Sequence, residues 1–134
     1  MSRTFLNARS AILAGAMLFG IATASFAGAQ DYEFQALQTE IKQGPTAIVS
    51  LRLIDKRTGK VVPDAVIFTT RMDMAPDGME MMTTTVNPST SMEPGVYAFT
   101  TNLSMEGGWR FQVAAKIQGE PETVKGEVVL KAVP

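Results

Sequence analysis

The 134-residue chain contains no cysteine and no histidine. Without cysteine it forms no disulfide, so the stability of the fold has to come from packing of the core. Without histidine it lacks the usual general base and the usual zinc ligand. Catalytic Ser-His-Asp and Cys-His arrangements are therefore excluded, and no Ser-x-x-Lys motif replaces them. We predict that the protein is not an enzyme.

An excess of charge of either sign is also missing. Lysine and arginine together number 12, aspartate and glutamate 13, and the formal net charge is −1. Such a balance leaves no basic surface for nucleic acid and no polybasic patch for anionic lipid. We therefore expect neither nucleic acid nor a lipid surface as a partner.

Long hydrophobic runs are absent apart from one short run near the start. Residues Ala11–Ile21 are apolar, follow two arginines and precede small residues up to Ala29. The run is too short to span a hydrocarbon core of about 30 Å, but it is typical of a secretory signal. We predict a signal peptide over residues 1–29, cleaved near Ala29. One periplasmic domain over residues 30–134 would remain, without stable membrane insertion.

Short extended segments make up most of this domain. In the segments Ala47–Ile54 and Trp109–Lys116 apolar side chains recur at every second position, the period of a strand with one buried face. The segments that we predict to be strands are 32–37, 47–54, 61–72, 79–86, 96–101, 109–116 and 122–133, with a loop over 87–95. About seven strands in a domain of this size predict an all-β, immunoglobulin-like two-sheet sandwich.

Methionine is abundant and concentrated in one part of the chain. Of nine methionines, the seven beyond Met1 and Met17 all fall between Met72 and Met105. Residues two apart in a strand point to the same side, so Met72 pairs with Met74 and Met79 with Met81. A turn at Pro76-Asp77-Gly78 would bring up to four thioethers to one end of the sandwich.

Two interpretations of this cluster remain open. Thioether sulfur is soft and carries no proton, so it suits Cu(I) and is a poor ligand for magnesium, calcium or zinc. A carboxylate from Asp73 or Glu80 could complete such a site. Alternatively, methionine is a flexible filler of cores and adaptable contact surfaces, and then the cluster needs no metal.

Several motifs together resemble those of the YtkA-like and FixH-like exported domains. The motifs are Val49-x-Leu-x-Leu-x-Asp55, Thr58-Gly59-Lys60-x-Val62-x-Asp64-Ala65, Met72-x-Met74-x-x-x-Gly78-Met79, Pro94-Gly95-x-Tyr97 and Leu103-Ser-Met-Glu-Gly-Gly-Trp109. The resemblance implies an immunoglobulin-like domain that handles copper, with a partner in respiratory oxidase assembly or metal efflux. It places Met72, Met74, Met79 and Met105 on the shared pattern, and Met81 and Met82 just beyond it.

Two functional hypotheses follow. The first is a periplasmic accessory protein that binds Cu(I), for copper delivery or tolerance, through Met72, Met74, Met79, Met81 and Met105. The second is an interaction module of the bacterial envelope that binds no metal.

Overall fold

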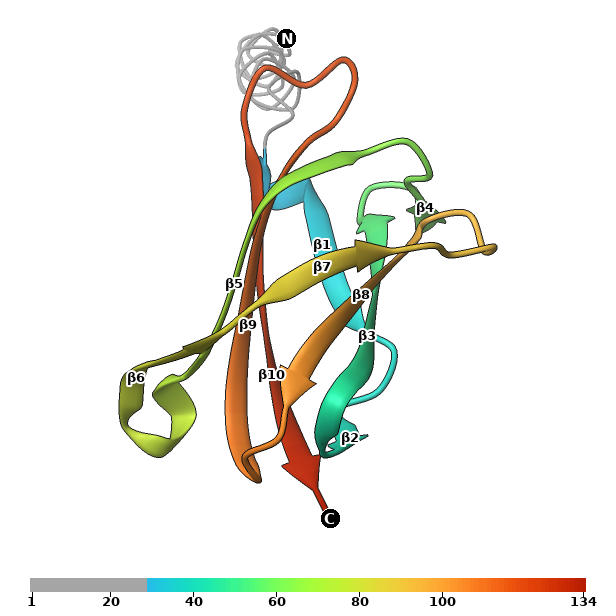
Figure 1. The fold of residues 1–134 in the computed structure, drawn as a ribbon. Helices are drawn as coiled ribbons and strands as arrows, with labels where there is room; N and C mark the ends of the chain where they lie inside the picture. Colours follow the sequence, from blue (N-terminus) through green and yellow to red (C-terminus); the bar gives the residue numbers. More distant parts are fainter. Residues whose placement is uncertain (1–28) are drawn as a thin grey trace, which may run out of the picture.

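The computed structural model describes residues 29–134, which form two β-sheets of five strands each (Figure 1). In spatial order the first sheet contains β1 (Tyr32–Ala36), β3 (Gly44–Asp55), β8 (Val96–Leu103) and β7 (Val86–Ser89), and β4 (Lys60–Val61) also pairs with β3. The second contains β2 (Glu40–Lys42), β10 (Val124–Val133), β9 (Gly107–Lys116), β5 (Val66–Met74) and β6 (Met79–Thr84). Two 3₁₀ helices are η1 (Ala29–Asp31) and η2 (Ala75–Asp77).

The order of the strands is that of an immunoglobulin fold. The path β1-β3-β8-β7 corresponds to strands A, B, E and D, and β10-β9-β5 corresponds to G, F and C. Strand β2 runs parallel to β10, whereas the other pairs are antiparallel. The predicted fold class is confirmed. The structure has ten strands where about seven were predicted, because the sequence gives little sign of the short strands β2, β4 and β7.

The core lies between the sheets, where the two strongest alternating patterns predicted it. Val49, Leu51 and Leu53 of β3 are buried, as is the opposing row of β9, Trp109, Phe111, Val113 and Ala115. Phe111 meets Phe99 of β8 edge to face, with ring centroids 5.2 Å apart. Full burial of each large apolar side chain stabilises the fold by roughly 1.5–3 kcal/mol, which explains stability without disulfides.

The loop predicted over 87–95 is wrong at its start, because Val86–Ser89 pairs with β8 as an edge strand. Pro88 obscured this strand, yet proline is tolerated at an edge, where its missing N–H faces outward.

The predicted signal peptide falls on residues 1–28, which lie outside the described part of the chain, and on Ala29. Within residues 29–134 no helix has the length and apolar character needed to cross a membrane.

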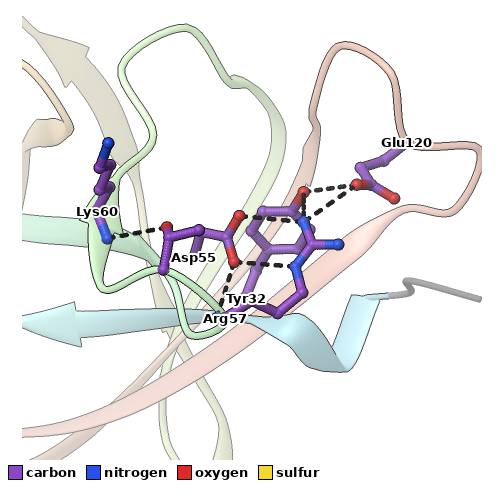
Figure 2. A network of polar contacts seen from close by, with 6 residues as sticks. Tyr32, Asp55, Arg57, Lys60 and Glu120 are labelled. Atoms are coloured by element: carbon purple, nitrogen blue, oxygen red, sulfur yellow. Dashed lines mark hydrogen bonds and ion pairs between the residues drawn. The ribbon is translucent and has the colours of Figure 1, made fainter. Parts of the chain in front are cut away.

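A polar network closes the end of the sandwich at which β1 begins (Figure 2). The Tyr32 hydroxyl donates to Glu120 Oε2 at 2.6 Å and accepts from Arg57 Nη2 at 3.1 Å. Arg57 in turn holds both carboxylate oxygens of Asp55. Burial and the hydrogen bond to Glu120 raise the pKa of Tyr32 to about 12. These contacts tie the β3–β4 turn and the β9–β10 loop to β1.

Candidate functional site

The methionine-rich segment forms a tight connection between β5 and β6. Strand β5 ends at Met74, η2 turns the chain, and Gly78 ends that helix with a positive φ of 76°. The pairing register shifts between Asp73 and Met74, so that Met74 lies opposite Met79. The predicted turn is therefore present, and it places one methionine of each flanking strand in a cross-strand pair.

The candidate methionines differ sharply in exposure. Met72 and Met74 have no exposed surface and belong to the hydrophobic core. By contrast, Met79 is 39% exposed, Met81 89% and Met105 43%. Solvent therefore reaches only three of the five candidates in this conformation. Met82, at 42%, is also accessible.

The β8–β9 loop, which carries Met105, packs against η2. The backbone N–H of Gly108 donates to Asp77 Oδ2 at 3.0 Å. A Cβ atom added to Gly107 would meet that same carboxylate and would lie 3.2 Å from Met74 Cε. In Figure 1 this loop and the β5–β6 connection occupy the same end of the sandwich. Two segments distant in sequence thus bring Met74, Met79 and Met105 to one end of the molecule.

A buried ionic cluster lies beside these methionines. Asp73 has no exposed surface and accepts from Arg110 Nη2 at 2.7 Å, Arg71 Nε at 2.8 Å and the Ala75 N–H at 3.0 Å. Burial alone raises the pKa of Asp73, but these hydrogen bonds outweigh it and lower the pKa to about 2. Asp73 is therefore a charged carboxylate whose oxygens are already engaged. The sequence allows Asp73 as a copper ligand, but in this conformation its carboxylate has a structural role.

Sequence reasoning missed this cluster because its members are far apart in the chain. Asp73 and Arg110 are 37 residues apart and face each other only because β5 pairs with β9. Arg71 also donates to the carbonyl oxygen of Glu80 at 3.0 Å, which fastens β6 to β5. The one available signal was the spacing of Arg71 and Asp73, which puts both on the same side of a strand.

The YtkA-like family model matches residues 26–114 of this chain. The chain belongs to the YtkA-like family. The matched range includes all five candidate methionines and ends within β9.

Comparison of this YtkA-like domain with curated proteins finds no match. Among solved structures, the Lin-41 filamin domain is 19% identical, with 72% of this chain and 91% of that chain covered at a TM-score of 0.44. A conjugative transposon lipoprotein from Bacteroides eggerthii is 12% identical, with 75% and 96% covered at a TM-score of 0.34.

The donors at this end of the YtkA-like domain are soft. Among residues 29–134, no three histidine, cysteine, aspartate or glutamate side chains are grouped as a metal site. What the end offers instead is thioether sulfur, with Glu80 as a nearby carboxylate whose side chain is 67% exposed. Thioether sulfur suits Cu(I) better than hard cations.

Proposed function

We propose that this YtkA-like domain is an accessory protein of the bacterial envelope that binds Cu(I) through methionine thioethers. The observation that supports this proposal is that β6, which carries the accessible Met79 and Met81, and the β8–β9 loop, which carries the accessible Met105, both adjoin η2 at one end of the sandwich. No catalysed reaction is part of the proposal.

The burial pattern suggests an order among the five methionines. Solvent-borne copper meets Met79, Met81 and Met105 first, because Met72 and Met74 are closed off by the core. Met74 lies across from Met79, so a small opening of the β5–β6 connection would add its sulfur to the site. Two or three thioethers hold Cu(I) without enclosing it, which suits transfer to an oxidase assembly or efflux component in the periplasm.

A competition titration tests the proposal. The β-sandwich domain, residues 30–134, is titrated with Cu(I) under anaerobic, reducing conditions against a chromogenic chelator. We expect stoichiometric binding, and at least a tenfold loss of affinity when Met79, Met81 and Met105 are all changed to leucine. Leucine keeps the apolar volume, so the fold is preserved while the sulfur is lost.

Met92 provides a matched control. Its side chain is 95% exposed, slightly more than that of Met81, but it lies in the loop between β7 and β8. Met92→Leu is expected to leave Cu(I) affinity unchanged. Equal affinities for the triple variant and the unsubstituted domain would refute methionine coordination at this end.

A non-metal interaction module is the second candidate function. It is favoured by the full burial of Met72 and Met74, which packing alone explains. If it is correct, copper binds no more tightly than micromolar, and the leucine variants keep both stability and partner binding.

A further inference from the structure

A groove lies away from the methionine-rich end, by which we mean the β5–β6 connection and the β8–β9 loop. It has a volume of about 660 Å³, within the range of roughly 300–1,000 Å³ that ligand sites occupy. Strand β5 forms one wall, β7 and the loop after it form the other, and β8 contributes to the floor. The groove therefore opens where the two sheets part at the side of the sandwich.

Strand β5 has an unpaired edge along this groove. Within residues 29–134, β6 pairs with β5 only through Met72, Asp73 and Met74. The rest of the strand, Val66–Arg71, has β9 on one side and no strand on the other. Its outward backbone donors and acceptors are spaced as a template for another extended chain.

The two edges that border the groove differ in protection. Strand β7 carries Pro88, which removes a backbone donor from its edge. From Val66 to Thr70, strand β5 has neither proline nor a charged residue. The edge of β5 is thus the one that can accept a further strand.

A bulge in β5 turns an aromatic side chain toward the groove. The register with β9 shifts between Ile67 and Thr69, which leaves Phe68 as the extra residue. Phe68 lines the groove and is 55% exposed. Bulges commonly redirect a side chain in this way next to binding sites.

The charge of the groove limits what it can bind. Glu93 is its single charged lining residue, and it lies 3.8 Å from Arg52 in an ion pair. The remaining lining is apolar or hydroxylated and includes Phe68, Met92 and Tyr97. The groove therefore matches an uncharged segment with an apolar side.

We propose that this groove binds an extended, uncharged peptide segment of a partner protein, which adds a strand to the edge of β5. The main chain of the peptide pairs with Val66–Arg71, and every second side chain packs on Phe68 and the groove wall. This surface is separate from the methionine-rich end and requires no copper.

The probe for the test is a ten-residue peptide of alternating serine and valine. The ¹⁵N-labelled domain, residues 30–134, is titrated with the peptide to millimolar concentration and followed by NMR. We expect amide shifts in Val66–Thr70 and in Met92–Tyr97, with a dissociation constant below about 1 mM. The same peptide N-methylated at every amide has no backbone donor left on either edge, and it should bind at least tenfold more weakly.

Two variants at positions of similar exposure distinguish peptide binding in the groove from non-specific hydrophobic binding. Phe68→Ala is expected to weaken peptide binding at least tenfold, whereas Val129→Ala, at a position that is 54% exposed on β10, should not alter it. Each variant is first compared with the unsubstituted domain by its NMR spectrum, which reports whether the fold is intact. Absence of shifts at 1 mM peptide, or shifts that N-methylation leaves unchanged, would overturn the proposal. So would sedimentation showing a dimer that Phe68→Ala dissociates, because a second copy of the chain would then cover β5.

Discussion

Asp73 is an anionic side chain held without any exposed surface, and three donors surround its carboxylate. Arg110 and Arg71 supply two charged donors, and Ala75 supplies a backbone N–H. Removal of a partner from such a pair leaves uncompensated buried charge, which costs more than the intact pair contributes. The cluster therefore stabilises the junction of β5, β6 and β9 at the methionine-rich end.

Asp73→Asn should lower the free energy of unfolding by about 2–3 kcal/mol. This loss is smaller than the loss from breaking a fully buried ion pair, because both arginines remain partly hydrated. Urea unfolding measures the change. Glu80→Gln is the matched control: its carboxylate lies 3.7 Å from Arg110 and is largely exposed, so the effect should stay below about 0.5 kcal/mol. Similar losses for the two variants would contradict the assigned role of Asp73.

The same cluster predicts a pH dependence. The pKa of Asp73 is about 2 in the folded protein, below its ordinary value of 3.8. Its contribution to stability is thus complete above about pH 4 and is lost as the pH falls through 2. The difference in unfolding free energy between the unsubstituted domain and Asp73→Asn should shrink over this interval. A difference that stays constant down to pH 2 would show that Asp73 is not held as a carboxylate.

At the scale of elements, a few side-chain hydrogen bonds hold the loops at both ends of the sandwich. The β8–β9 loop is held against η2 through Asp77, and the Trp109 indole N–H donates to the Met105 carbonyl at 3.0 Å. The segment between β4 and β5 is held by Tyr97, whose hydroxyl donates to Val62 O at 2.6 Å and accepts from the Ala65 N–H at 3.0 Å.

Gly107→Ala should loosen the methionine-rich end. Gly107 has a φ of +132°, and an added Cβ would collide with the Asp77 carboxylate near Met74. Gly119→Ala is the control, because its φ is +91° but nothing lies within 4 Å of an added Cβ. We expect Gly107→Ala to lower the free energy of unfolding by about 1–3 kcal/mol more than Gly119→Ala does, because the added methyl group overpacks the contact with η2. Hydrogen exchange should rise at Asp77 and Gly108. Equal losses would mean that the loop does not press on η2.

The two tyrosines predict the alkaline behaviour of the domain. Burial and the bond to Glu120 raise the pKa of Tyr32 to about 12, and burial also raises the pKa of Tyr97. The folded state favours the neutral phenols. Their contribution to the free energy of unfolding is therefore present below about pH 10 and is lost as the pH rises beyond it. In the Tyr97→Phe variant, where Tyr32 is the remaining tyrosine, absorbance at 295 nm should show one transition near pH 12. A transition near pH 10 in that folded variant would contradict the network around Tyr32 in Figure 2.

At the scale of the whole molecule, the methionines fall into a buried group and an accessible group. Met72 and Met74 are part of the continuous core, whereas Met81 and Met92 extend into solvent from different regions of the surface. The copper proposal depends on this division, because coordination by the buried pair requires part of the β5–β6 connection to open.

Mild peroxide treatment followed by peptide mass spectrometry tests the division. Oxidation of thioethers follows exposure, so Met81 and Met92 should form sulfoxide first. Met72 and Met74 should remain unmodified until the domain unfolds. The same treatment in denaturant should oxidise all seven methionines of the domain at similar rates. Early oxidation of Met72 or Met74 in the folded domain would show that the end opens readily.

The sequence by itself determined the fold class and the main strands. Alternation fixed the inward rows of β3 and β9 because neighbouring side chains in a strand point to opposite faces. It also determined the turn between Met74 and Met79, since Pro76 and Gly78 favour one locally. These features depend on residues close together in the chain.

Only the tertiary structure decided which methionines are accessible, because burial depends on what the other sheet places opposite each side chain. The spacing of Met72 and Met74 in the sequence predicts neither the register shift at Met74 nor the packing of Met72 in the core. The pairing of Asp73 with Arg110 likewise exists only because β5 lies beside β9. The groove along β5 is also a tertiary feature, since an edge is defined by the absence of a neighbouring strand.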